Sequence, residues 1–156
     1  MAWAFMKAGT EPSLRARAMR FLARREHSRE ELRRKLAPHA AEGEDVEAVL
    51  DELAAKGWLS DARFAEHTAR AKARRYGPAK LTHYLKSRGV DDEAIAAGIR
   101  AAGQEGAAQL ETIWKSRFRQ PPMDEREKAR QVRFLQGRGF ALEEVLRFLK
   151  SLDASR

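Results

Sequence analysis

One seven-residue pattern occurs twice in this chain, 50 residues apart. The two copies are Tyr84-Leu85-Lys86-Ser87-Arg88-Gly89-Val90 and Phe134-Leu135-Gln136-Gly137-Arg138-Gly139-Phe140, in which a leucine, an arginine and a glycine recur in step. At the same shift of 50 residues, Glu93 matches Glu143, Ile95 matches Val145 and Ile99 matches Leu149. A fixed period of this length is typical of proteins built from stacked repeats.

A third, looser copy lies toward the N-terminus. Arg24-Arg25 matches Arg74-Arg75, and Leu32 and Leu36 match Leu81 and Leu85. Val49 and Leu53 match Ile95 and Ile99 once about three extra residues around 40–43 are allowed. We therefore expect three repeats, at residues 13–58, 59–102 and 103–152. A flexible N-terminal segment at 1–12 and a tail at 153–156 would flank them.

Helix start and stop signals divide each repeat into three short helices. Expected starts are a capping box from Ser28 to Glu31, a cap at Ser60 or Asp61, Pro78 at a first helical position, and caps at Asp91 and Asp124. Glycines expected in left-handed C-terminal caps are Gly57, Gly89 and Gly139. Ala141 is a poor N-cap, so we expect the last helix to begin irregularly. The sequence predicts an all-α fold: an elongated, curved array of three tandem three-helix repeats.

The composition excludes several other classes. Among 156 residues there are 28 Ala and 15 Leu but only 5 Val and 3 Ile, which favours helices over strands. The chain has no Cys, and its four His lack metal-ligand spacing, so we expect no metal site, no cofactor and solvated or half-buried histidines. No nucleophile, phosphate-loop or paired-carboxylate motif occurs, so we expect no catalytic residue and no enzyme. No apolar run could span a membrane, so we expect a cytoplasmic monomer without membrane contact.

Charge alternates along the chain in blocks. Residues 14–39, 62–90 and 112–138 carry net charges of +6, +7 and +5, whereas residues 40–61 and 91–111 carry −6 and −4. A basic band in every repeat indicates a charged binding surface, although solvated surface remains the plainer explanation for any single arginine. The candidate binding residues are Arg17, Arg20, Arg24, Arg25, Arg63, Arg70, Lys72, Arg74, Arg75, Tyr76, Lys80, Lys86, Arg88, Arg130 and Arg133.

Helical spacing places some of these side chains together. Arg63, Arg70 and Arg74 are expected on one helical face, at the centre of the most basic band. Tyr76 is the one aromatic residue expected on a basic face. Its position leaves two alternatives equally open, an exposed ring that could stack on a base and a ring packed in a core. Trp58 and Trp114 are expected to pack in cores.

Three passages resemble the RecX family, the bacterial regulators of the RecA recombinase. They are Arg25-Glu26-His27-Ser28-Arg29-Glu30-Glu31-Leu32-Arg33-Arg34-Lys35-Leu36, the stretch from Val49-Leu50-Asp51-Glu52-Leu53 through Gly57-Trp58-Leu59-Ser60-Asp61-Ala62-Arg63-Phe64-Ala65, and Tyr76-Gly77-Pro78 with the following Leu85, Arg88, Gly89 and Val90. The resemblance covers about residues 13–152, with Ala141 departing from the small polar residue expected there.

The resemblance implies tandem three-helix repeats and a protein that is not an enzyme. It implies binding to RecA on single-stranded DNA, in the groove of the filament, with inhibition of the ATPase and of strand exchange and an effect on the SOS response. Single- and double-stranded DNA would be weak, salt-sensitive partners. The alternative is an autonomous, sequence-independent nucleic-acid-binding helical module. A set of exposed aromatic residues on the basic faces would favour that alternative.

Overall fold

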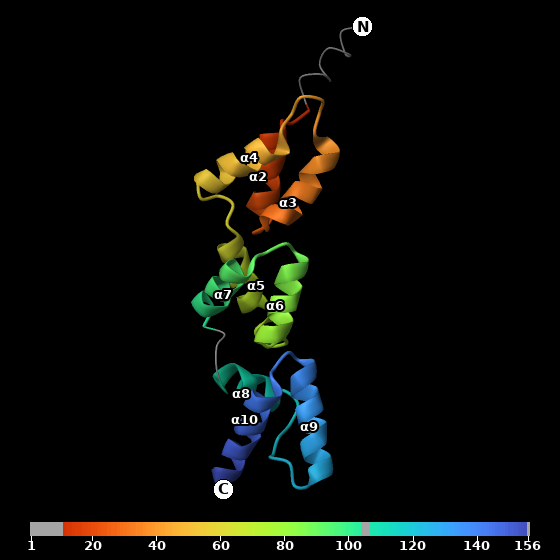
Figure 1. The fold of residues 1–156 in the computed structure, drawn as a ribbon, viewed down its shortest axis with the longest axis vertical. Coiled ribbons are helices and arrows are strands. Elements are labelled where there is room, and N and C mark those ends of the chain that lie inside the picture. The colour runs from red at the N-terminus through yellow and green to blue at the C-terminus, as the bar shows by residue number, and fades with distance from the viewer. Residues whose placement is uncertain (1–10, 104–106, 156) are drawn as a thin grey trace. The chain divides into compact units, whose positions relative to one another are not determined.

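The computed structural model describes residues 11–103 and 107–155 (Figure 1). All the regular structure in this part of the chain is helical. The helices are α2 (Leu14–Arg24), α3 (Arg29–Leu36), α4 (Val46–Ala55), α5 (Asp61–Lys72), α6 (Pro78–Ser87), α7 (Asp92–Ala101), α8 (Ala107–Lys115), α9 (Glu125–Gly137) and α10 (Leu142–Ala154), with a 3₁₀ turn at Ala37–His39. The all-α, three-helix prediction is confirmed, and the segment expected to be flexible at 1–12 lies almost wholly outside the described residues.

The contacts divide the chain into two compact units, one ending at Phe64 and the other beginning at Ala65. The first unit holds α2, α3, α4 and the start of α5, and the second holds the remaining helices. The elongation and curvature of the array stay predictions, which small-angle scattering tests.

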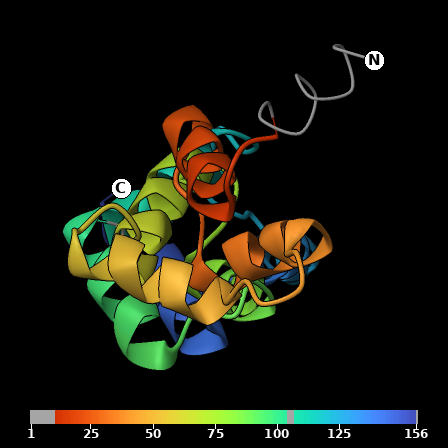
Figure 2. The same cartoon turned by 90° about the horizontal axis from the view of Figure 1, so that it is seen from above.

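The first unit buries one apolar stripe from each of its three helices. Its core is formed by Leu14, Ala18, Leu32, Leu36, Leu50, Leu53 and Leu59. Figure 2 shows that α2, α3 and α4 are not parallel to one another. The predicted cap is confirmed, because the Ser28 hydroxyl accepts from the Glu31 amide at 3.1 Å. Between the two candidate caps of α5, Ser60 accepts from the Arg63 amide at 3.2 Å, and Asp61 instead accepts from the Arg29 amide at the start of α3 at 2.8 Å.

In the second unit, helix starts and ends also follow the sequence signals. Pro78 occupies the first turn of α6. Asp91 and Asp124 cap α7 and α9 through the amides of Ala94 and Glu127, each at 2.8 Å. Ala141 makes no side-chain cap, as expected, yet α10 begins regularly at Leu142, because the Val145 amide donates to the Ala141 carbonyl at 3.0 Å.

The third repeat has its own core, in which the predicted burial of Trp114 is confirmed. Leu110, Ile113, Trp114, Leu135, Phe140, Val145, Phe148 and Leu149 form this cluster. The Trp114 indole N–H donates to the Gln131 side chain at 2.8 Å, which satisfies the one polar group that the ring carries into the core.

Main-chain hydrogen bonds join the second repeat to the third inside the second unit. The Gly77 amide donates to the Arg138 carbonyl at 2.5 Å, and the Ala79 amide donates to the Gly139 carbonyl at 3.0 Å. Gly139 has a φ of +98°, and a Cβ added there would lie 2.6 Å from both Cβ and N of Lys80. The turn before α10 therefore meets the start of α6 at backbone distance. We call this contact the glycine joint.

The expectation for Trp58 is wrong. Its side chain is 41% exposed, not packed in a core. Gly57, with a φ of +75°, ends α4 as expected, but the turn that it makes carries Leu59, not Trp58, into the core.

Candidate binding surface

Two half-buried tyrosines and three cations meet at the end of α5 and along α6. The Lys72 ammonium lies 5.2 Å from the centre of the Tyr76 ring and 4.7 Å from that of Tyr84. Lys80 lies 4.4 Å from the Tyr76 ring, and the Arg88 guanidinium lies 4.9 Å from the Tyr84 ring. We call Lys72, Tyr76, Lys80, Tyr84 and Arg88 the tyrosine cluster. It brings together five residues, four of which are among the predicted candidates.

Local sequence explains how the tyrosine cluster forms. Lys80, Tyr84 and Arg88 are four residues apart, so they line one face of α6 and its C-terminal cap. Gly77 and Pro78 turn the chain into α6 directly after Tyr76. A cation over an aromatic ring is attracted to the negative face of the ring. Such a surface can hold phosphates or carboxylates beside flat, partly exposed rings.

The other candidates of the second unit are arranged differently. Arg70 donates to Glu66 at 2.6 Å and to the Ala101 carbonyl at 3.3 Å, so its side chain has partners within the protein. Arg74 does not share its helical face, because α5 ends at Lys72 and Arg74 lies in the turn that follows. Arg74 and Arg75 are both exposed there.

Lys86 lies outside the tyrosine cluster. Its ammonium is 3.1 Å from the carboxylate of Asp92, and both side chains are largely exposed. An exposed ion pair of this kind contributes little to stability.

The candidates of the first unit fall into two groups. Arg17, Arg20 and Arg24 lie along α2, and the last two are exposed. Arg25 and Arg63 are instead paired with carboxylates, Arg25 with Glu31 at 3.0 Å and Arg63 with Glu26 at 2.5 Å. These two arginines therefore help to hold the unit together.

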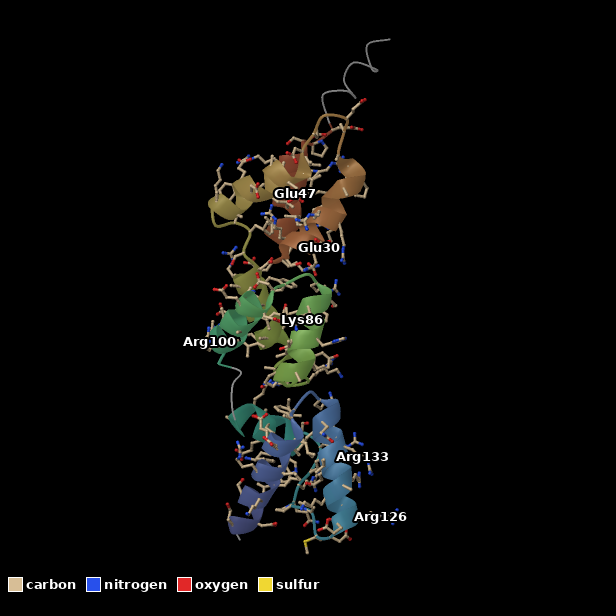
Figure 3. All side chains as sticks on the ribbon, viewed as in Figure 1. Glu30, Glu47, Lys86, Arg100, Arg126 and Arg133 are labelled. Atoms are coloured by element: carbon tan, nitrogen blue, oxygen red, sulfur yellow. The ribbon has the colours of Figure 1, made fainter. Side chains whose placement is uncertain are left out.

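In the third repeat, the predicted Arg133 and the neighbouring Arg126 project from α9 on the side away from α10 (Figure 3). The Arg130 guanidinium lies 5.9 Å from the Phe118 ring. Arg138 lies 5.0 Å from the Phe134 ring, which repeats the pairing of Arg88 with Tyr84 fifty residues earlier.

Sequence analysis missed Tyr84 and the Phe134–Arg138 pair. The signal was present, because each aromatic residue precedes an arginine by four residues in the pattern that defines the repeat. The pattern had been interpreted only as evidence for the fold.

The described groups whose pKa values are clearly shifted all lie in the first unit, and His27 and Glu47 are two of them. Burial lowers the pKa of His27, whose Nδ1 lies 3.0 Å from the Arg25 carbonyl and whose Nε2 lies 2.8 Å from the Lys35 ammonium. The expectation that every histidine is solvated or half-buried is wrong at this position. Hydrogen bonds from Arg33 and Arg29 lower the pKa of Glu47 to about 2. The ion pairs of Glu47 connect α4 to Arg29 and Arg33 of α3.

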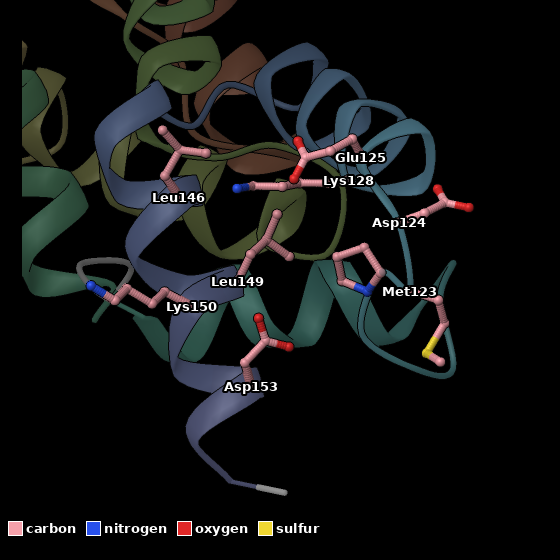
Figure 4. Close-up of a pocket in the computed structure, with 9 residues that line it drawn as sticks. Met123, Asp124, Glu125, Lys128, Leu146, Leu149, Lys150 and Asp153 are labelled. Atoms are coloured by element: carbon pink, nitrogen blue, oxygen red, sulfur yellow. The ribbon is translucent and has the colours of Figure 1, made fainter.

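Neither a metal site nor a membrane-spanning helix occurs in the described part of the chain. A groove of about 340 Å³ opens between α9 and α10, where Leu146 and Leu149 face Lys128 and Glu125 (Figure 4). Met123, at its edge, is 64% exposed. The groove mixes acidic, basic and apolar side chains and shows no catalytic arrangement.

Comparison with known proteins connects the three repeats to one family. The family models that match are the first three-helix domain of RecX at residues 15–53, the second at 60–99 and the third at 104–149. A relative from Ralstonia nicotianae named Regulatory protein RecX is 46% identical over 142 residues, covering 91% of this chain and 89% of the relative. One of the same name from Pseudomonas entomophila is 42% identical over 146 residues, covering 92% and 94%.

Solved structures share the fold. The crystal structure of RecX from Lactobacillus salivarius matches with a TM-score of 0.71 at 17% identity, covering 90% of this chain and 95% of that one. A second crystal structure, of regulatory protein RecX, also matches with a TM-score of 0.71, at 20% identity and with coverage of 88% and 71%.

Proposed function

Because the chain belongs to the RecX family of regulatory proteins, we propose that it binds the RecA–single-stranded DNA filament and modulates it, mainly by inhibiting its ATPase and recombinase activities. Recombination and the SOS response would change accordingly. The protein acts by binding and carries out no chemistry of its own.

The basic surface of the second unit carries this proposal. Within this unit, residues 65–90 hold a net charge of +6. Arg74 and Arg75 are exposed beside the tyrosine cluster, and no described residue forms an ion pair with either side chain. A filament of protein and DNA presents carboxylates and phosphates, and charge-assisted hydrogen bonds to either are among the stronger ones in proteins.

A RecA ATPase assay on single-stranded DNA, with and without this protein, tests the proposal. The test variant is Arg74→Ala with Arg75→Ala, because Arg70 is already bonded to Glu66. Each lost charged contact costs about 1.5–3 kcal/mol, so two losses weaken inhibition by on the order of 100-fold or more if they add.

The matched control is Arg147→Ala with Lys150→Ala, which removes the same charge from exposed positions of α10. We expect the control to inhibit like the parent protein. Failure of the parent to inhibit RecA would refute the proposed function, whereas equal inhibition by both double variants would refute only the assignment of the surface.

A second function, autonomous binding of nucleic acid, is favoured by Tyr84. The sequence pointed to a single tyrosine on the basic face, and the tyrosine cluster has two. Aromatic rings among cations suit unpaired bases, and each stacked base is worth about 1–3 kcal/mol. The function is tested with labelled single-stranded and duplex DNA in the absence of RecA.

We expect Tyr76→Ala with Tyr84→Ala to weaken single-strand binding more than duplex binding, because paired bases are not free to stack. Replacement of both residues by Phe keeps the rings and should preserve binding. Affinity should also fall steeply with salt for both DNAs. Equal losses for both DNAs would exclude stacking.

A further inference from the structure

A separate aromatic surface lies in the first unit, around the exposed indole of Trp58. A groove of about 400 Å³ is lined by Met19, Leu22 and Ala23 of α2 together with Gly57, Trp58 and Arg63. Large exposed aromatic side chains are costly in water and are concentrated where proteins bind partners. We call this site the Trp58 groove.

The Trp58 groove is formed in advance of any ligand. Gly57 adopts a φ of +75°, and the amides of Trp58 and Leu59 both donate to the Leu53 carbonyl, at 3.0 and 3.2 Å. This turn fixes the backbone that carries the indole. On the opposite wall, Met19 and Leu22 pack against the buried core of the unit. Preformed apolar walls reduce the entropy lost on binding.

Cations border the Trp58 groove. The Arg15 guanidinium lies 5.8 Å and the Lys56 ammonium 5.0 Å from the centre of the indole ring, and Arg63 forms part of the lining. Glu52 bonds to both Arg15 and Lys56, at 2.8 and 3.2 Å. One carboxylate therefore serves two exposed cations, which leaves capacity for another. Helix α2 adds three more arginines and contains no acidic residue.

We propose that the Trp58 groove binds an acidic segment of a partner protein, which inserts one large apolar side chain against Trp58. Apolar walls accept the inserted side chain, and the bordering cations pair with carboxylates on either side of it. A nucleobase fits less well, because the three side chains of the α2 wall, Met19, Leu22 and Ala23, offer no hydrogen bond to a base edge. This site is separate from the surface assigned to RecA and DNA above, so either can be right without the other.

Synthetic peptides test the Trp58 groove in the absence of RecA. The first peptide carries a central Phe flanked by Asp and Glu, the second replaces that Phe with Ala, and the third replaces the acids with Lys. An oligothymidylate serves as the nucleic-acid probe. Binding is measured by the anisotropy of a dye on each probe, with circular dichroism to verify that every variant is folded.

The first peptide should bind, and both the Ala peptide and the Trp58→Ala variant should weaken binding at least about tenfold. Leu142→Ala, which removes another exposed apolar side chain, should have no effect. Lys56→Glu should weaken binding of the acidic peptide and strengthen that of the lysine peptide, whereas Lys150→Glu on α10 should change neither. The proposal is overturned if Trp58→Ala binds like the parent protein, if the Phe and Ala peptides bind equally, or if only the oligothymidylate depends on Trp58.

Discussion

Replacement of Gly139 by Ala tests the glycine joint, and its cost has two separate sources. At a φ of +98°, an L side chain is strained by roughly 1–2 kcal/mol. The new Cβ would also lie 2.6 Å from the backbone N of Lys80, which cannot move without breaking the bond from the Ala79 amide. Such overpacking costs about 1–3 kcal/mol. The replacement also lowers the entropy of the unfolded chain, which offsets about 0.4–1 kcal/mol of this cost, so the net loss is about 1–5 kcal/mol.

Gly103→Ala is the matched control in the same unit. Gly103 also has a positive φ, +67°, but a Cβ there would meet nothing within 4 Å. Its replacement should therefore cost the strain alone. Urea unfolding, followed by circular dichroism, measures both variants. The midpoint should fall further for Gly139→Ala than for Gly103→Ala, by the equivalent of about 1–3 kcal/mol. Equal destabilisation would refute the close approach that defines the joint.

Three further predictions follow from buried or paired polar groups. Hydrogen bonds from Arg33 and Arg29 hold the pKa of Glu47 at about 2, so Glu47→Gln should be less stable than the parent protein at neutral pH. The urea midpoints of the two proteins should converge as pH falls from about 4.5 toward 2, because Glu47 then becomes protonated. A difference that stays constant with pH would contradict this prediction. Because the pKa of His27 is lowered, the unfolded chain takes up its proton first, and stability should fall as pH drops below about 6.5. His27→Asn should flatten this dependence in urea titrations, and an unchanged dependence would contradict the burial argument. Gln131→Leu leaves the Trp114 indole N–H without its partner and should destabilise the protein by about 1–3 kcal/mol in thermal unfolding; an unchanged melting temperature would show that the hydrogen bond is dispensable.

The helices and most of their ends could be predicted from sequence because the determining interactions are local. Ser28, Asp91 and Asp124 each bond to an amide three residues ahead, and Gly139 adopts the backbone conformation that glycine alone tolerates well. The 50-residue period, in turn, predicted that the chain holds three repeats. These signals depend on neighbours along the chain and not on tertiary contacts.

The surface was harder to predict because it depends on which elements meet. Asp61 is the first residue of α5 in sequence but accepts a hydrogen bond from the start of α3 in space, and Arg63 pairs with Glu26 from the connection between α2 and α3. Neither contact has a sequence signature. The ion pair of Arg70 with Glu66 does have a sequence signal, because the two residues are four apart on one helix. The pattern of basic residues alone does not include that acidic partner.

The prediction that Trp58 packs in a core was wrong for a related reason. A large apolar residue next to Leu59 is compatible with burial of either one, and the turn at Gly57 decides which of the two enters the core. The hydrophobicity of the two residues does not predict which of them is buried.

The glycine joint has a consequence for how the second unit opens. Its hydrogen bonds connect amides and carbonyls of residues about sixty positions apart in the chain, so the amides of Gly77 and Ala79 are protected only while both repeats are folded together. Hydrogen exchange at these two sites should therefore follow the opening of whichever of the two repeats unfolds more readily, and not the fraying of one helix. Because main-chain atoms alone form these bonds, the side chain at position 79 can vary without loosening the connection, whereas the Arg138 side chain adds a bond of its own to the Arg75 carbonyl at 3.4 Å.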